Sequence, residues 1–405
     1  MSQATQALTA PAASPMRLVG VVSAAHFVSH YYIIILAPLL PFVRDAYGVS
    51  YTEIGLAFAA FNVVSAALQT PAGFLVDWLG ARMLLILGLA IGGVAFILVG
   101  LIDSFWVLVA MFALAGVGNT VYHPADYALL SQHVPAKRIG QAFSIHTFAG
   151  MLGSAVAPAS LLIMQNLWGG RGAFIGAGIV GLAVAAIILA LRDQAPPQAP
   201  ARSTQDTSAA GPVGWQLLLS PPILLNLLFF MMFALMSAGM FNYSVVALGA
   251  LHGTPVTLAN GALSSLLLFS AGGVLVGGVL VAWTARHAVV AGLGMLGMAA
   301  AATLLGQFDF GPWALIAAMT AFGFCFGVIM PSRDMILRDI TPPGSFGKVF
   351  GFVTTGFNIG GIIAPMVFGA LMDAGHPRLV FFTVAAFAVL GLLTVTTLPK
   401  QQITP

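Results

Sequence analysis

Charged residues are so rare in this chain, and so evenly spaced, that they divide it into long uncharged stretches. Asp, Glu, Lys and Arg make up 6% of its 405 residues, against roughly a quarter in a soluble globular protein. A membrane helix needs about 20 consecutive apolar residues. The stretches free of these four residue types are 18–43, 54–76, 83–102, 104–125, 139–170, 172–191, 207–285, 287–308, 310–332, 349–372 and 379–399. This pattern predicts an integral membrane protein.

The lengths of these stretches predict the number of membrane helices. Ten of the eleven are 20 to 32 residues long, which suits one helix each. The stretch 207–285 has 79 residues and is interrupted by His252-Gly253-Thr254-Pro255, so we expect two helices and some linker within it. The sequence therefore predicts twelve membrane helices. It does not show the short alternating segments, about ten residues each, of a membrane β-barrel.

The basic residues predict the orientation in the membrane. If the N-terminus is cytoplasmic, three basic residues outside the spans face the other side, namely Arg44, Arg171 and Arg378, and Arg333 lies within a span. The other ten are then cytoplasmic: Arg17, Arg82, Lys137, Arg138, Arg192, Arg202, Arg286, Arg338, Lys348 and Lys400. Because cytoplasmic loops carry the excess of Lys and Arg, both termini are expected in the cytoplasm. No cleavable leader is expected, since the apolar segment after Arg17 is too long for one.

One segment near the middle of the chain has a different composition. Residues 193–216 are rich in Pro, Ala, Ser and Gln and have no apolar periodicity, which predicts a mobile cytoplasmic linker after the sixth helix. We therefore expect an N-terminal tail over 1–16, a six-helix bundle over 17–192, the linker over 193–216, a second six-helix bundle over 217–399 and a C-terminal tail over 400–405.

The two halves of the chain repeat each other. A shift of 207 residues places Pro124 on Pro331, Gly153 on Gly360 and Pro158 on Pro365, with further matches between them. Parallel repeats in a carrier pack about an axis along the membrane normal, with the substrate site between them. The expected fold class is an all-α integral membrane protein with twelve transmembrane helices in two pseudo-symmetric six-helix bundles.

Charge and motif content exclude several functional classes. A net charge of +3 is too small for a nucleic-acid binder, and the single cysteine, Cys325, allows neither an internal disulfide nor a cysteine-built metal site. The chain has no G-x-x-x-x-G-K-[ST] motif for ATP. It also has no HExxH or GxSxG motif, so we expect neither an enzyme nor a bound cofactor or metal. A sensor or structural membrane protein would be expected to carry an added soluble domain.

One short loop resembles the signature of a known family. The run Gly73-Phe-Leu-Val-Asp77-Trp78-Leu-Gly80-Ala81-Arg82 is similar to the G-x-x-x-D-[RK]-x-G-[RK]-[RK] motif between helices 2 and 3 of the major facilitator superfamily. Together with twelve spans in two sets of six, it identifies the chain as resembling that family. The resemblance implies a conformational gate at Gly73, Asp77, Gly80 and Arg82, met by Arg138 at the start of helix 5. The alternative is a solvated loop charge.

Three further runs resemble the fosmidomycin-resistance group of efflux carriers within that family. They are Ser29-His30 with Pro38-Leu-Leu in helix 1, Tyr51-Thr-Glu-Ile-Gly-Leu…Gln69-Thr-Pro-Ala-Gly73, and Val121-Tyr-His123-Pro124 in helix 4. That group often has an Asn-Asp pair after the helix 1 histidine, where this chain has Tyr31 and Tyr32.

Ionisable residues inside the spans are the main candidates for chemistry, because they are costly in a bilayer. Asp126 lies on helix 4 with His123 and Tyr127 at helical spacing. Its repeat equivalent on helix 10 is Arg333, and the resemblance implies that helices 1, 4, 7 and 10 line a central cavity. Asp126 and Arg333 are therefore expected to face each other. They either couple transport to protons and substrate or form a static latch at the cytoplasmic gate.

Histidines are the second group of candidates. His26 and His30 are four residues apart on helix 1, next to Tyr32, and His146 lies on helix 5. Histidine titrates near pH 6.5 in water, so these side chains suit proton relay or substrate binding in a wet cavity. The alternatives are metal binding by the two helix 1 histidines and ordinary hydrogen bonds between helices. Uncharged polar residues of the spans, namely Asn62, Gln69, Asn226, Asn242 and Asn358, are further candidates for substrate contact.

These observations predict a secondary carrier that moves a small organic molecule by alternating access. We expect export in exchange for protons, and the alternative is a proton-coupled uptake carrier for a small organic anion or metabolite. A pocket with few charges favours amphipathic or mildly anionic substrates, with Arg333 as the anion contact. The expected partners are the substrate, protons and the lipid bilayer, without nucleic acid. The protein is expected to lie in the bacterial inner membrane and to be a monomer.

Overall fold

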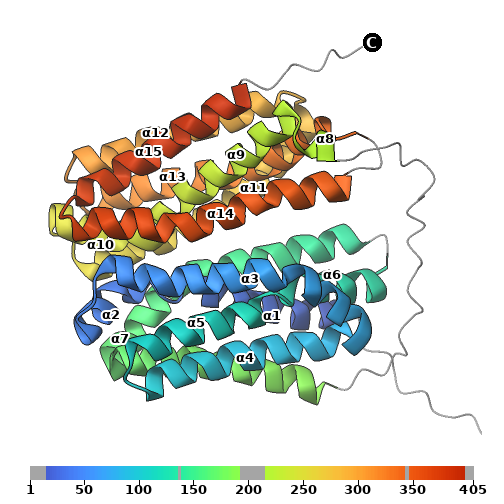
Figure 1. Ribbon diagram of the computed structural model, residues 1–405, viewed down its shortest axis with the longest axis horizontal. Helices are drawn as coiled ribbons and strands as arrows, with labels where there is room; N and C mark the ends of the chain where they lie inside the picture. The colour runs from blue at the N-terminus through green and yellow to red at the C-terminus, as the bar shows by residue number, and fades with distance from the viewer. Residues whose placement is uncertain (1–14, 136–137, 192–214, 343–345, 397–405) are drawn as a thin grey trace, which may run out of the picture.

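The chain folds into helices throughout its described part (Figure 1). This computed structural model describes residues 15–135, 138–191, 215–342 and 346–396. The first half contains α1 (Pro15–Ile34), η1 (Ala37–Leu39), α2 (Leu40–Tyr47), α3 (Tyr51–Leu79), α4 (Ala81–Leu101), α5 (Phe105–Asn119), α6 (Tyr122–His133) and α7 (Ile139–Ala190). The second half contains α8 (Trp215–Leu218), α9 (Pro221–Ala238), η4 (Gly239–Tyr243), α10 (Ser244–His252), α11 (Val256–Trp283), α12 (His287–Gln307), α13 (Pro312–Asp339), α14 (Phe346–Asp373) and α15 (Pro377–Thr396).

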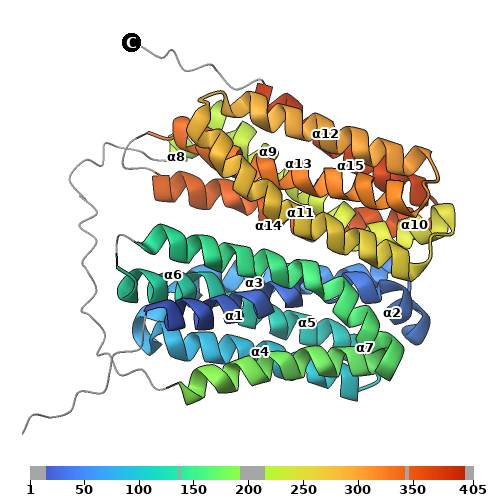
Figure 2. The same ribbon diagram turned by 180° about the vertical axis from the view of Figure 1, so that it is seen from behind.

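Eleven helical segments of the described residues are long and apolar enough to cross a membrane. One of them, α7, has 52 residues, and its backbone leaves the helical region at Gly169, where φ is 73°. The part before Gly169 packs on α1, where Gly153 lies against Phe27, and the part after it packs on α4, where Gly178 lies against Gly93. Since α7 reverses at this glycine (Figure 2), the described helices are consistent with the predicted twelve crossings.

Local sequence signals place several helix ends. Ser50 caps α3 through a reciprocal pair, in which its hydroxyl accepts from the Glu53 N–H at 3.1 Å and the Glu53 carboxylate accepts from the Ser50 N–H at 2.7 Å. Gly48 ends α2 in the left-handed region, with φ 62°. Gly80 joins α3 to α4 with φ 85°, a conformation that glycine adopts without steric cost.

Three predicted spans are broken helices instead of continuous ones. The first crossing consists of α1, η1 and α2, and the fourth consists of α5 and α6, which are separated at Thr120 and Val121. Proline explains the second break, because Pro124 has no N–H to donate to the Thr120 carbonyl. The seventh crossing consists of α9, η4 and α10, and η4 is a π-helical turn. Such turns are rare and often occur at functional sites.

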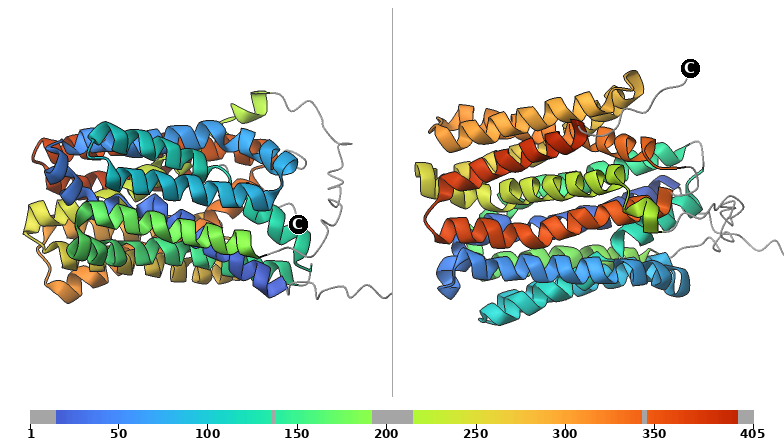
Figure 3. Two further views of the ribbon diagram at one scale, coloured as in Figure 1. Left: turned by 90° about the horizontal axis from the view of Figure 1, so that it is seen from below. Right: turned by 45° about the horizontal axis from the view of Figure 1, so that its top comes forward.

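The two halves form two bodies that lie side by side, with their helices running in roughly the same direction (Figure 3). In Figure 1, α1–α7 form the lower body and α8–α15 the upper one. We call the end where α2 and α10 lie the α2/α10 end, and the opposite one the α6/α8 end. Small residues let α3 and α14 approach closely across the seam: a Cβ on Gly55 would lie 3.1 Å from the Pro365 carbonyl oxygen, and one on Gly369 would lie 2.8 Å from Thr52.

The predicted fold class, an all-α membrane protein with two helical bundles, agrees with this architecture. The linker predicted over 193–216 lies almost wholly outside the described residues, and so do the two tails. Four helix ends lie toward the α6/α8 end of the molecule (Figures 1 and 2): the start of α1, the end of α7, the start of α8 and the end of α15. That arrangement agrees with both termini lying on the same side of the membrane. The cytoplasmic location of the termini and the domain boundaries stay predictions.

Candidate functional site

A cavity of about 290 Å³ lies between the two bodies. Residues from both halves line it, including Phe58 and Phe61 of α3, Phe241 of η4 and Phe326 of α13. Its polar lining residues are His30, Tyr32, Asn62, Ser154, Ser237, Asn242 and Ser270. A pocket shared by two pseudo-symmetric halves is where a carrier of this architecture holds its substrate.

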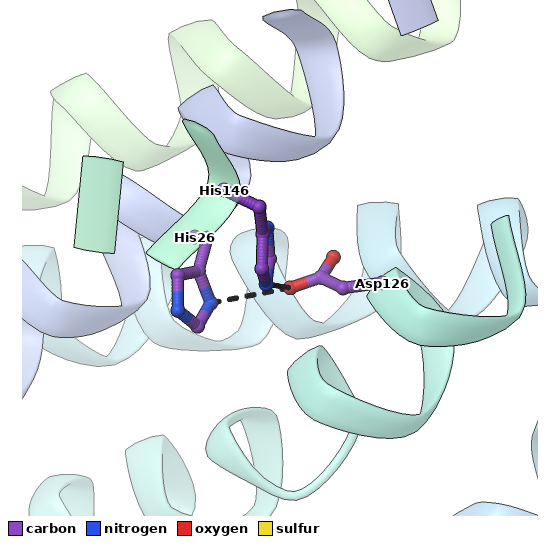
Figure 4. Close-up of side chains that lie close together, drawn as sticks. All are labelled: His26, Asp126 and His146. Carbon is purple, nitrogen blue, oxygen red and sulfur yellow. Dashed lines mark ion pairs between the residues drawn. The ribbon is translucent and has the colours of Figure 1, made fainter. Parts of the chain in front are cut away.

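A buried cluster of one carboxylate and two imidazoles lies in the first half (Figure 4). The Oδ2 atom of Asp126 lies 3.3 Å from Nδ1 of His26 and 3.6 Å from Nε2 of His146. Asp126 is 0% exposed, His146 1% and His26 4%. The three side chains come from α6, α7 and α1, so helices far apart in sequence build this site.

The cluster extends to two more histidines. The His26 ring stacks on His146 with 3.8 Å between centroids, and it lies 4.6 Å from His30 and 5.3 Å from His123. His30 lines the cavity, and its Nδ1 atom is 3.4 Å from the Ser154 hydroxyl. His123 is exposed at the start of α6. The four histidines therefore form one cluster around His26, which reaches the cavity at His30 and an exposed position at His123.

Tyrosines complete the surroundings of Asp126. Tyr127, 47% exposed, has its ring 6.0 Å from His146 and 5.1 Å from Phe143. Tyr122 is buried one helical turn before Asp126, and its hydroxyl has no hydrogen-bond partner among the described residues. Of the predicted group, Asp126 is buried, whereas His123 and Tyr127 are exposed and have their rings stacked 6.3 Å apart.

Glycine makes room for the imidazoles. A Cβ at Gly150 of α7 would lie 2.4 Å from Cδ2 of His26 and 2.9 Å from Cδ2 of His30. Contacts below 3.0 Å are too short for a carbon atom, so only glycine fits at this position without a shift of the rings. Gly150 therefore acts as part of the site, a role that no motif in the sequence indicated.

The cluster also has the spacing of a metal site. One ligand atom from each of His26, Asp126 and His146 lies within 4.8 Å of the others. However, the two rings are stacked, with 30° between their planes, and both direct a nitrogen at the same carboxylate oxygen (Figure 4). Both nitrogens thus approach one oxygen of the carboxylate, which suits exchange of protons better than three ligands around one ion, and none of these atoms has a hydrogen-bond partner among the described residues.

The structure does not bring Asp126 and Arg333 together, contrary to the expected pairing across the pseudo-axis. The guanidinium of Arg333 binds the neighbouring Asp334 at 2.9 Å and lies over the ring of Phe230, 4.5 Å from its centroid. Sequence spacing could not reveal this outcome, because adjacent residues on a helix usually point in different directions. Arg333 is 9% exposed and is not among the described residues that line the cavity.

The other candidate residues of the spans differ in whether they line the cavity. Tyr32 lines the cavity, and its hydroxyl donates to the Ala177 carbonyl at 3.3 Å. Asn358 lies half-buried on α14, next to the cavity-lining Phe357, and is not itself among the described lining residues. Asn62 and Asn242 do line it, as do Ser154, Ser237 and Ser270, for which the sequence offered no signal.

The predicted gate is described only in part. The surroundings of Gly73 and the side chain of Asp77 lie outside what the structure describes. Arg82 donates to the carbonyl of Ile188 at 2.7 Å and also to that of Leu191, which ties the start of α4 to the end of α7. Arg138 is exposed at the start of α7. The gating role of Gly73, Asp77, Gly80, Arg82 and Arg138 stays a prediction.

Comparison with known families gives one match over nearly the whole chain. A family model described as Major Facilitator Superfamily matches residues 22–289 and 284–404. Two solved structures have a similar fold: nucleoside transporter NupG, with a TM-score of 0.77 and 14% identity over 95% of this chain and 100% of that one, and a bacterial homolog of the human lysosomal transporter Spinster, with a TM-score of 0.78 and 15% identity over 95% and 97%.

Curated relatives are transporters or resistance proteins. The Fosmidomycin resistance protein of Escherichia coli K12 is 24% identical over 98% of this chain and 97% of its own length. The probable sulfoacetate transporter SauU of Cupriavidus necator is 31% identical over 41% of this chain. The probable L-galactonate transporter of Escherichia coli K12 is 29% identical over 35%. The chain spans only 38% and 32% of the length of the last two.

Proposed function

The chain belongs to the Major Facilitator Superfamily of membrane transporters, and we propose that it exports a small organic molecule by alternating access in exchange for protons. The proton-coupling role falls to Asp126. The observation that carries this proposal is the buried carboxylate 3.3 Å from His26 and 3.6 Å from His146, in a cluster of histidines that reaches the cavity at His30.

The physical argument rests on the cost of burying charge. An isolated carboxylate in an apolar interior costs several kcal/mol unless it is paired or protonated. The ionisable groups that surround Asp126 are His26 and His30 of α1, Tyr122, His123 and Tyr127 of α6, and His146 of α7. All of them can gain or lose a proton, and none is a permanent cation. Asp126 either carries a proton itself or is balanced by a proton on a neighbouring imidazole, so both ways of holding it in the interior keep a proton on the cluster.

Alternating access also needs a seam that can open and close. The described hydrogen bonds between the two halves run from α3 to α14. Those at the α2/α10 end join Asp373 to Tyr51 and Thr52, and one further along joins Asn62 to the Gly361 carbonyl at 3.4 Å. A second hollow, of about 630 Å³, lies between α7 and α11 and shares Met151 with the central cavity. These features support a conformation in which the α2/α10 end is closed.

The export direction is favoured by the match to the Fosmidomycin resistance protein, which covers nearly all of both chains. The alternative is proton-coupled uptake of a small organic anion or metabolite, favoured by the partial matches to the sulfoacetate and L-galactonate transporters.

The test is transport by purified protein reconstituted in vesicles with an acidic interior, with fosmidomycin, sulfoacetate, L-galactonate and the neutral alcohol tryptophol as probes. An exporter inserted inside-out should accumulate a probe as long as the gradient lasts. The Asp126→Asn variant should lose the gradient dependence but keep exchange of probe for probe. His252→Gln serves as the control, because His252 contacts the Leu305 carbonyl, far from the cluster. Gradient-driven transport that is unchanged in Asp126→Asn would contradict the coupling role, and accumulation only with an acidic exterior would favour uptake.

A further inference from the structure

The charge of the cavity lining restricts what can bind there. None of the described residues that line the cavity is an Asp, Glu, Lys or Arg, and His30 is its one strongly titratable side chain. Two ionisable side chains of the spans are engaged elsewhere: Arg333 with Asp334, and Asp126 with the buried imidazoles. A charged ligand would lose its water in this cavity without meeting a fixed counter-charge, which is strongly unfavourable.

Aromatic rings from both bodies face the cavity. Phe58 and Phe61 come from α3, and Phe112 comes from α5. On the opposite side, Phe326 packs on Phe241 with 5.0 Å between ring centroids and on Phe233 with 4.6 Å. A cavity lined by aromatic rings from both halves favours a flat aromatic ligand, which can pack against such rings.

The π-helical turn η4 places an amide among these rings. Phe241 and Asn242 lie in this turn, and both line the cavity. The turn is fixed on two sides: the Tyr243 hydroxyl donates to the Pro365 carbonyl at 3.0 Å, and the Phe368 ring occupies the space where a Cβ of Gly239 would stand, 2.3 Å away. Among the described residues, none forms a hydrogen bond to the Asn242 side chain. Its amide is therefore free to bind a ligand.

A second amide lies on the other body. Asn62 of α3 donates to the Phe58 carbonyl at 2.8 Å and to the Gly361 carbonyl of α14 at 3.4 Å, so it is held at the seam between the halves. An amide from each half thus reaches the same cavity. Uncharged groups that both donate and accept hydrogen bonds suit a neutral polar ligand.

We infer that the central cavity binds a neutral, flat aromatic compound with a hydrogen-bonding group, and that Asn242 and Asn62 select it. The inference rests on the proposed function, since it names the substrate class for the same cavity. A volume of about 290 Å³ is at the lower end of ligand pockets and fits a single small ring system. This class differs from the anions that the names of several relatives mention.

The test compares three probes that share one ring system and nearly one size: neutral tryptophol, anionic indole-3-acetate and cationic tryptamine. Their dissociation constants are measured by calorimetry on the full-length protein in detergent at neutral pH. Tryptophol should bind at least tenfold more tightly than either charged probe. Equal or tighter binding of indole-3-acetate, or no binding of tryptophol at millimolar concentration, would overturn the inference.

Variants locate the binding. Asn242→Leu and Asn62→Leu keep the approximate size of the side chain but remove its hydrogen bonds, and each should weaken tryptophol about tenfold. Asn166→Leu, at an exposed position of α7 away from the cavity, should leave binding unchanged. Thermal unfolding without ligand identifies a variant that has lost its fold. If Asn242→Leu does not fold, Asn242→Ser is measured in its place. Tryptophol binding that is unaffected in the Asn242 variant that folds would contradict the assignment.

The outcome can be separated from that of the proposed function. A preference for the anion, together with proton-driven transport that depends on Asp126, would refute only the substrate class. Tight binding of tryptophol, together with transport that ignores the proton gradient in the unmodified protein, would refute only the coupling.

Discussion

Asp373, at the end of α14, accepts hydrogen bonds from the backbone N–H of Thr52 at 2.8 Å and from its hydroxyl at 2.6 Å. The other oxygen of this carboxylate accepts from the Tyr51 N–H at 2.8 Å. A residue of the second half thus caps the first turn of a helix in the first half, where free N–H groups favour a negative charge. The contact closes the α2/α10 end and has to break whenever that end opens.

Removal of this cap should therefore open the α2/α10 end. Hydrogen bonds to a charged group contribute roughly 1.5–3 kcal/mol each, so Asp373→Ala should raise the population open at this end at least tenfold. The measurement is the labelling rate of a cysteine at Ser237, in the cavity, by a reagent that cannot cross the membrane. The native Cys325 is first replaced by Ser, since it is the single cysteine of the chain.

Asp309→Ala is the matched control, because Asp309 is an exposed carboxylate in the loop between α12 and α13 at the same end. If both variants label at the rate of the unmodified protein, the Asp373 cap does not control this end.

A methyl group at Gly150 should damage the histidine cluster. The Cβ of Gly150→Ala would stand 2.4 Å from the His26 ring, so the imidazoles have to move away from Asp126. We expect proton-coupled transport to fall at least tenfold, with a smaller effect on exchange of substrate for substrate. Both are measured in the reconstituted vesicles described above. Gly140→Ala on the same helix should have no effect, since nothing lies within 4 Å of a Cβ there. Equal activities of the two variants would show that the cluster tolerates the shift.

Much of the fold could be predicted from the sequence, because the bilayer imposes a simple rule. Charge-free stretches of about 20 residues have to become helices that satisfy their own backbone hydrogen bonds. The internal breaks were not predicted, since they depend on proline and on local packing. The π-helical turn Gly239–Tyr243 has a composition like the rest of its span, and hydropathy does not distinguish it.

The candidate site was predicted less completely. The cost of ionisable groups in a bilayer pointed to Asp126, His26 and His146 separately. Their contact depends on how three helices pack against one another. The positions of charged residues and the hydropathy of the spans do not indicate this packing. For Arg333 the sequence predicted a contact that the structure does not contain. Repeat symmetry placed Arg333 opposite Asp126, but Arg333 pairs with its neighbour Asp334 on the same helix, and this pair requires no contact between the two halves.

Replacement of Arg333 should alter transport rate and leave substrate affinity unchanged. Its guanidinium binds Asp334 and lies over Phe230 and Phe233, outside the cavity lining described here. Arg333→Met should therefore lower the maximal rate several-fold and leave the dissociation constant of tryptophol within a factor of two. Arg333→Lys should recover only part of the rate, since an ammonium group does not reproduce the planar stacking of a guanidinium.

Arg338→Met, at an exposed position near the end of α13, is the control and should behave like the unmodified protein. Should Arg333→Met weaken indole-3-acetate more than tenfold and spare tryptophol, Arg333 would be the anion contact that the sequence predicted.

The reversal of α7 depends on one glycine, and its neighbour provides the comparison. Gly169 has φ 73° and ψ 172°, a backbone conformation that is essentially restricted to glycine and that costs other residues roughly 1–3 kcal/mol. Gly170 is the next residue and has no such φ, and a Cβ there would meet only the Gln165 side chain, at 3.9 Å. Gly169→Ala should therefore lower the thermal unfolding temperature in detergent. Gly170→Ala should leave it unchanged or raise it, because alanine favours a helix over glycine by up to about 1 kcal/mol. Since both variants add one methyl group at the same turn, a difference in sign isolates the backbone conformation from the added bulk. Equal changes in the unfolding temperature of the two variants would mean that the reversal of α7 does not depend on the backbone conformation of Gly169.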